Sequence, residues 1–262
     1  LETDTQYGAV VPPIHLTSTF AFDGYEGKRT YDYSRSGNPT RDALGSALAD
    51  LEGGAGAVVT SSGMAAVSLI TQLLRPEQVD VVPHDCYGGT YRLFNALNER
   101  GALQVRWVDY QDPADVAAAL QDSPAIVWIE TPSNPLLRLV DIEKVADAAR
   151  AAGALVVADN TFMSPVWQQP LALGADVVVH STTKYLNGHS DVVGGAVVAA
   201  SAERHEQLAW WANCIGITGA PFDSFLTLRG LRTLHARMRA HDENTHRLAD
   251  LLSGHPAVSK VY

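Results

Sequence analysis

Residues 176–190 read DVVVHSTTKYLNGHS, and this stretch decides the fold more than any other part of the chain. Three successive valines, residues 177–179, are typical of a short strand that is buried on both faces of a sheet. The polar residues Ser181, Thr182, Thr183 and Lys184 follow almost at once. Since ligands of open α/β sheets bind beyond the carboxyl ends of the strands, these four residues are candidates for a functional site.

Six further apolar runs lie on either side of this stretch, and several are separated by segments with helical periodicity. The predicted strands are residues 57–60, 79–83, 105–108, 125–130, 154–158, 176–180 and 194–200. The predicted helices are one that begins at Pro39 and ends before Gly53, then 62–74, 90–101, 113–121, 141–153 and one long helix over 222–246. Alternating strands and helices indicate an α/β fold whose mainly parallel central sheet is covered on both faces.

Composition narrows the class of protein. The 262 residues include 19 Lys and Arg against 29 Asp and Glu, a net charge of −10, which disfavours non-specific binding to nucleic acid. No apolar run approaches the roughly 20 residues of a membrane span, and the first ten residues do not resemble a signal peptide. Two cysteines cannot form a disulfide framework, so we expect a cytoplasmic protein without a membrane partner.

Polar residues follow four of the predicted strands directly, and we expect them to form one site at a common edge of the sheet. The four segments are SSGM at 61–64, PHDCYGG at 83–89, DNT at 159–161 and STTKY at 181–185. The first begins a helix, where free backbone N–H groups favour a phosphate. Ser62 is equally a preferred helix cap, and the sequence alone leaves both interpretations open.

Two side chains in these segments suggest chemistry. A desolvated lysine is a nucleophile suited to Schiff-base formation, and Lys184 lies between an apolar strand and Tyr185-Leu186 rather than among solvated residues. Asp159 is either a turn-forming residue or a buried carboxylate that needs a cationic partner such as a protonated ring nitrogen.

Other classes of site fit poorly. No Gly-x-Ser-x-Gly or Gly-x-Gly-x-x-Gly motif stands in the required context. The nine histidines show no metal-ligand spacing, so we expect no metal, and His180 is interpreted with the others as a loop or capping residue. Cys86 is interpreted as a small packing residue.

Residues 176–190 as a whole resemble the pyridoxal-phosphate attachment segment of the Cys/Met-metabolism (transsulfuration) enzymes, a group of the aspartate-aminotransferase-like type I fold. The similarity extends over the whole chain and includes YDYSRSGNPT at 31–40, TPSNP at 131–135 and ADNTF at 158–162. This resemblance implies a PLP-dependent transferase or lyase with pyridoxal 5'-phosphate (PLP) as cofactor.

The resemblance also implies roles for individual residues. Lys184 would hold the cofactor covalently and shuttle protons, Asp159 would pair with the pyridinium nitrogen, and Tyr87 would stack on the ring and belong to the catalytic residues. The remaining cofactor-binding residues would be Ser62, Gly63, Met64, Ser181, Thr183, Thr161 and Asn134, together with Tyr33 and Arg35 from the neighbouring subunit.

The same resemblance implies an organisation in three parts. Residues 1–46 would be an arm that reaches the neighbouring subunit, residues 47–230 the PLP-binding domain, and residues 231–262 a linker helix with the start of a small C-terminal domain, which would be largely missing from this chain. A donated arm requires at least a dimer, and we expect a homotetramer built as a dimer of dimers with shared active sites.

Within the family, residues 85–94, 208–213 and 222–234 are most similar to bacterial cystathionine γ-synthases. The implied substrates are O-succinylhomoserine and cysteine. The alternatives are γ-elimination of cystathionine, direct sulfhydrylation, or a cofactor-binding module without chemistry. The expected substrate contacts are Arg92, Asn134, Asp32 and Tyr33. Arg92 would bind the distal carboxylate of the succinyl group, with a solvent-facing helix residue as the equal alternative.

Overall fold

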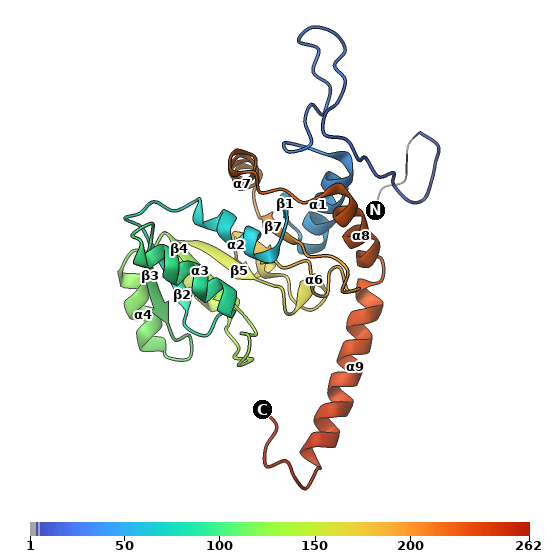
Figure 1. The fold of residues 1–262 in the computed structure, drawn as a ribbon. Helices are drawn as coiled ribbons and strands as arrows, with labels where there is room; N and C mark the ends of the chain where they lie inside the picture. Colours follow the sequence, from blue (N-terminus) through green and yellow to red (C-terminus); the bar gives the residue numbers. More distant parts are fainter. Residues whose placement is uncertain (1–3, 5) are drawn as a thin grey trace.

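A computed structural model describes residue 4 and residues 6–262, and a seven-stranded sheet lies at its centre in the order β1-β7-β6-β5-β4-β2-β3 (Figure 1). The strands are β1 Gly56–Thr60, β2 Val79–Pro83, β3 Gln104–Val108, β4 Ile126–Glu130, β5 Leu155–Asp159, β6 Val177–His180 and β7 Gly195–Ala199. The helices are α1 Pro39–Glu52, α2 Gly63–Thr71, α3 Gly88–Glu99, α4 Pro113–Gln121, α5 Ile142–Ala151, α6 Ser164–Trp167, the 3₁₀ helix η1 Pro170–Leu173, α7 Ala202–Ile215, α8 Pro221–Leu231 and α9 Leu234–Ser253.

The sheet is mainly parallel, as the alternation of strands and helices predicts. Strands β2, β3, β4, β5 and β6 pair in parallel, and only β7 runs against its two neighbours, β6 and β1. The carboxyl ends of six strands therefore meet at one edge of the sheet. All seven predicted strands are present, and their bounds differ by at most one residue at either end.

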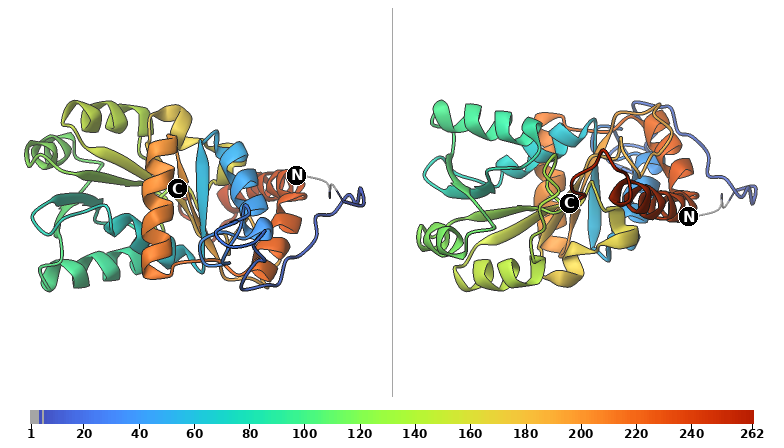
Figure 2. Two further views of the ribbon diagram at one scale, coloured as in Figure 1. Left: turned by 90° about the horizontal axis from the view of Figure 1, so that it is seen from above. Right: turned by 90° about the horizontal axis from the view of Figure 1, so that it is seen from below.

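Both faces of the sheet are covered by helices, which Figure 2 shows from two sides. Val177 and Val179 of β6 pack with α2, α3 and α7 on one face, whereas Val178 packs with α1 and α8 on the other. Helices α4 and α5 cover the second face over β2, β3, β4 and β5, with α4 packed on β3 and α5 on β5. Successive side chains of a strand point to opposite faces, so a strand covered on both sides must be apolar throughout.

Local sequence explains where several helices begin and end. The Asn38 side chain accepts hydrogen bonds from the backbone N–H groups of Thr40 and Arg41 at the start of α1. Gly53 ends the same helix with a φ of 73°, a left-handed conformation that glycine adopts without strain. The predicted helix from Pro39 to Gly53 is confirmed.

The prediction of a single helix over residues 222–246 is wrong, because the chain forms two helices, α8 and α9, with Arg232 and Thr233 between them. A side chain at Gly230 would lie 2.2 Å from the carbonyl oxygen of Asn187, so α8 packs directly on the loop that follows Lys184. Tertiary packing of this kind leaves no local mark in the sequence, since neither Pro nor Gly occupies the break.

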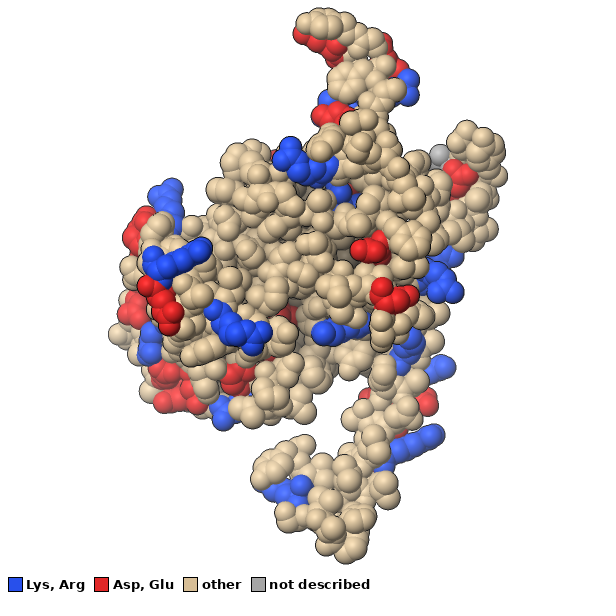
Figure 3. Space-filling model, viewed as in Figure 1, with Lys and Arg blue, Asp and Glu red and all other residues tan. Residues whose placement is uncertain are grey.

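The N-terminal segment and α9 both extend away from the sheet (Figure 1). Residues 6–38 form neither helix nor paired strand apart from one bridge between Thr19 and Tyr33, while residues 1–3 and 5 of the predicted arm lie outside the described part of the chain. The surface is hollowed between α9 and the body, and basic and acidic side chains are interspersed on the face in Figure 3. Among the described residues, no helix has both the length and the apolarity to cross a membrane.

Candidate active site

A cavity of about 290 Å³ opens at the carboxyl edge of the sheet, where the four predicted segments meet. Ten of the residues predicted from the sequence line it: Ser62, Gly63, Met64, Tyr87, Asn134, Asp159, Thr161, Ser181, Thr183 and Lys184. They come from five different stretches of chain, so the fold brings together residues that are up to about 120 positions apart in sequence.

Lys184 lies in the turn after β6, at the boundary between this cavity and an adjoining one of about 770 Å³ that extends toward α9. Within residues 4 and 6–262, no hydrogen bond or ion pair engages its Nζ atom. An amine that has no partner and faces a cavity is available for covalent chemistry with a carbonyl compound.

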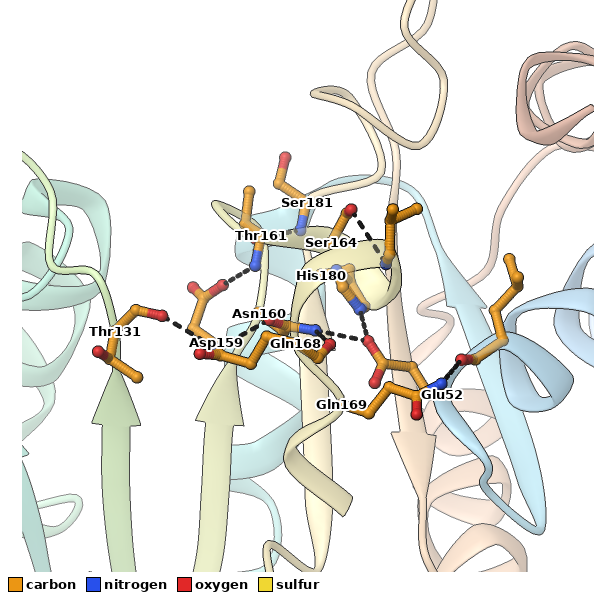
Figure 4. A network of polar contacts seen from close by, with 12 residues as sticks. Glu52, Thr131, Asp159, Asn160, Thr161, Ser164, Gln168, Gln169, His180 and Ser181 are labelled. Carbon is orange, nitrogen blue, oxygen red and sulfur yellow. Dashed lines mark hydrogen bonds and ion pairs between the residues drawn. The ribbon is translucent and has the colours of Figure 1, made fainter. Parts of the chain in front are cut away.

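Asp159 ends β5, and burial raises the pKa of its carboxyl group above the usual range. Its Oδ1 accepts a hydrogen bond of 3.0 Å from the backbone N–H of Thr161, whose Oγ1 in turn accepts one of 2.8 Å from the backbone N–H of Ser181 (Figure 4). A protonated ring nitrogen placed against Asp159 would supply the positive charge that this partly buried carboxylate lacks.

Glu130 belongs to the same site, and sequence reasoning missed it. It ends β4 in register with Asp159, and burial together with the nearby Asp159 raises the pKa of its carboxyl group to about 8. Its oxygens accept hydrogen bonds from the backbone N–H groups of Tyr87, at 2.7 Å, and Asn134, at 2.9 Å. The signal was present, because Glu130, like Asp159, is a carboxylate at the end of an apolar strand.

The start of α2 has the form of a phosphate cradle. The Ser62 hydroxyl accepts a hydrogen bond of 3.0 Å from the N–H of Ala65 and is thus a helix cap, which leaves the first-turn N–H groups of Gly63 and Met64 facing the cavity. A side chain at Gly63 would lie 2.6 Å from Cβ of Ser181, so only glycine allows this close approach. The residues present therefore fit a phosphate group.

Thr183 is predicted to bind the phosphate, but in the structure its hydroxyl is already hydrogen-bonded to the backbone. Its hydroxyl donates to the carbonyl oxygen of Gly194 at 3.2 Å and accepts from the N–H of the same residue at 3.1 Å. The side chain lines the cavity while it ties the lysine turn to the segment before β7.

The other predicted site residues lie outside this cavity within one chain. Arg92 is exposed on α3, and Asp32 pairs with Lys28 at 3.0 Å. Tyr33 is half exposed beneath the Arg35 guanidinium, which donates to the carbonyl oxygen of Asn213 at 3.2 Å. Their roles toward substrate or cofactor stay predictions.

Two minor predictions have clear outcomes. Cys86 is a buried packing residue as expected, and burial raises the pKa of its thiol to about 12.

The interpretation of His180 as a loop or capping residue is wrong. His180 is the last residue of β6, is 1% exposed and lies 2.6 Å from the carboxylate of Glu52. Three valines before it made a buried position predictable, but its partner comes from a helix 128 residues away.

Comparison with known proteins identifies the family. The family model described as "Cys/Met metabolism PLP-dependent enzyme" matches residues 1–262. A curated relative, the cystathionine gamma-synthase of Escherichia coli strain K12, is 56% identical over 263 residues, which cover 100% of this chain and 68% of the relative.

Solved structures agree with this assignment. The cystathionine gamma synthase of Xanthomonas oryzae pv. oryzae, crystallised with aminoacrylate and cysteine, superposes with a TM-score of 0.97 at 62% identity and covers 99% of this chain and 67% of that one. The cystathionine gamma-lyase of Lactobacillus plantarum, complexed with L-serine, has a TM-score of 0.96 at 41% identity and covers 100% and 68%. The chain thus belongs to the Cys/Met-metabolism family of PLP-dependent enzymes.

Proposed function

We propose that this protein is a cystathionine γ-synthase, which replaces the succinyl group of O-succinyl-L-homoserine with L-cysteine to give L-cystathionine and succinate. The observation that carries the proposal is the similarity to enzymes with synthase names, at 56% and 62% identity, against 41% for the γ-lyase described above. Members of one family share the cofactor site, so only these finer similarities separate the activities.

The site residues suit the cofactor part of this reaction. PLP, when bound, supplies an electron sink that makes the C–H bond beside the substrate amino group acidic. In our proposal Lys184 forms the covalent link, Asp159 keeps the proton on the ring nitrogen, Tyr87 lies against the ring face, and the N–H groups of Gly63 and Met64 bind the phosphate.

Lys184 would then move the protons of the substrate. Its Nζ takes the proton from Cα and, once it has given that proton up, takes one from Cβ, which becomes acidic in its turn. Both carbons regain a proton after the C–S bond has formed, so these transfers cancel over the whole reaction. Succinate leaves with the electron pair of the Cγ–O bond, and the sulfur of cysteine forms the new Cγ–S bond. The thiol proton is the net proton that is released.

We further propose that the arm completes the site of a neighbouring subunit in a homotetramer in the cytoplasm. Tyr33 and Arg35 lie outside the cavity of their own chain, which suits residues that serve another protomer's phosphate. An arm with little secondary structure of its own would gain further order by binding to such a neighbour.

Product analysis of the full-length protein tests the proposed activity. Incubation with O-succinylhomoserine and cysteine should yield cystathionine and succinate in equal amounts. Incubation with cystathionine alone should yield 2-oxobutyrate far more slowly. A faster release of 2-oxobutyrate from cystathionine would identify a γ-lyase, and equal use of sulfide in place of cysteine would identify a sulfhydrylase.

A further inference from the structure

A buried histidine–carboxylate pair lies directly beneath the candidate site. Glu52 is the last residue of α1 and His180 the last residue of β6, and each side chain is 1% exposed. His180 Nε2 lies 2.6 Å from Glu52 Oε1, which also accepts a hydrogen bond of 2.8 Å from Asn160 Nδ2 (Figure 4). Because this oxygen already serves Asn160 as an acceptor, His180 Nε2 donates the second bond.

The hydrogen bonds continue from this pair to a third strand. Asn160 Nδ2 also donates to the carbonyl oxygen of Gln168 at 2.8 Å. Gln168 Nε2 donates to Asn160 Oδ1 and to the carbonyl oxygen of Thr131, both at 3.0 Å. We call Glu52, His180, Asn160 and Gln168 the Glu52 network.

The network is joined to the site through the chain itself. Thr131 follows Glu130, Asn160 follows Asp159, and His180 precedes Ser181. The backbone next to each site residue at the ends of β4, β5 and β6 is therefore held by the same four side chains. The nearby His180 acts to lower the pKa of Asp159, against the larger effect of burial, which raises it.

Stability alone does not account for such an arrangement. Burying a histidine and a carboxyl group removes two polar side chains from water, and apolar replacements of such pairs are often as stable or more stable. Within the described part of the chain, Glu52 Oε2 and His180 Nδ1 have no hydrogen-bond partner. Burying these two polar atoms without a partner lowers the free energy of unfolding. We therefore look for the role of the Glu52–His180 pair in the strand ends that it holds in place.

We propose that the Glu52 network is a positioning unit for the cofactor site. It fixes the ends of β4, β5 and β6 so that Asp159 faces the ring nitrogen and the Thr161–Ser181 pair faces the phosphate. None of its four side chains lines the cavity, so none is a catalytic residue. The inference rests on the proposed roles of Asp159 and Ser181.

The test measures the dissociation constant of PLP and the melting temperature of the cofactor-free form, both on the full-length protein. Glu52→Ala removes the shared acceptor, and Gln168→Ala removes the bonds to Thr131 and Asn160. Both variants should bind PLP about tenfold more weakly, as is typical when an outer hydrogen-bond partner of a ligand-holding group is lost. Glu52→Gln keeps an acceptor oxygen and should recover most of that affinity.

Two matched controls separate positioning from general destabilisation. Leu48→Ala empties a buried site one turn earlier in α1 and should lower the melting temperature without changing PLP affinity. Gln169→Ala removes a bond to the carbonyl oxygen of Leu51, close to the network but unconnected to the strand ends, and should leave PLP affinity unchanged.

The proposal is overturned if Glu52→Ala and Gln168→Ala bind PLP within about twofold of Leu48→Ala at comparable stability. Should Glu52→Ala not fold, Gln168→Ala decides alone, because its side chain is only partly buried. Asp159→Asn is measured in parallel. Unchanged affinity in that variant would refute the proposed site itself, whereas a loss there without one in the network variants refutes only the positioning role.

Discussion

At the scale of residues, the site is organised around two carboxylates on neighbouring strands. Glu130 and Asp159 lie in register at the ends of β4 and β5, and burial raises the pKa of both. Two like charges at close range in a poorly solvated site disfavour ionisation of both, unless a cation lies between them. The pair therefore favours a bound cation and makes the cofactor-free protein sensitive to pH.

The Glu130 carboxyl should make the cofactor-free form lose stability as pH rises from about 5 to 8. Its pKa is about 8 when folded, against 4.5 as the ordinary value, so the native state holds a proton that the unfolded state has released. Chemical denaturation across this range should show a smaller loss in Glu130→Gln than in the wild-type protein. Equal slopes for the two proteins would contradict the assignment.

Asp80 is another buried carboxyl group, remote from the cavity, and its removal should stabilise the protein. It is 0% exposed in β2, neither oxygen has a partner among the described residues, and burial raises its pKa well above the usual range. Asp80→Val should increase the free energy of unfolding by about 1–3 kcal/mol. The gain should be larger at pH 8 than at pH 5, because a carboxyl group whose pKa is raised by folding destabilises the folded state increasingly as pH rises. A loss of stability at both pH values would show that Asp80 has a partner.

Substitution of Arg92 tests whether O-succinylhomoserine is the substrate. If its guanidinium binds the distal carboxylate of the succinyl group, Arg92→Ala should raise KM for O-succinylhomoserine about tenfold and leave KM for O-acetylhomoserine nearly unchanged. An equal effect on both esters would assign Arg92 to the solvent-facing surface of α3, where it is exposed in a single chain.

At the scale of elements, the site depends on how closely helix starts approach strand ends. Both α2 and α3 begin with a glycine, but a side chain at Gly63 would lie 2.6 Å from Cβ of Ser181, whereas one at Gly88 would have only an ordinary contact of 3.5 Å with Arg92. The two positions form a matched pair for substitution.

Gly63→Ala should weaken PLP binding by about tenfold or more, because the added methyl group separates α2 from Ser181 at the phosphate cradle. Gly88→Ala should have little effect. Titration of the cofactor-free protein with PLP measures both, and equal affinities would show that α2 does not hold the phosphate.

The helices and strands also show how much of the fold the sequence could predict. Apolar runs such as residues 177–179 predict buried strands, and glycines or proline at helix ends predict α1, because these signals are local. The break between α8 and α9 and the pairing of Glu52 with His180 depend on contacts between distant segments. No local pattern contains that information, whereas Glu130 could have been found by the reasoning that found Asp159.

At the scale of the whole molecule, the sheet edge carries the candidate site while two extensions leave the body (Figure 1). The N-terminal segment presents Tyr33 and Arg35 away from their own cavity, and α9 projects from the body with Leu248 and Leu251 exposed (Figure 1). The cavity beside Lys184 continues toward α9, where Arg237 donates to the carbonyl oxygen of Tyr185 at 2.7 Å. The lysine turn is thereby linked to the helix that leaves the domain.

In our proposal PLP is carried on the strand-end site by Lys184, one of four lysines in the sequence. Borohydride reduction of the full-length protein with bound PLP, followed by proteolysis and mass spectrometry, tests it most directly. If Lys184 holds PLP, we expect a pyridoxyl adduct on the peptide that contains Lys184 and no such adduct in Lys184→Ala. An adduct on Lys28, Lys144 or Lys260 instead, or one that persists in the variant, would show that Lys184 does not carry PLP.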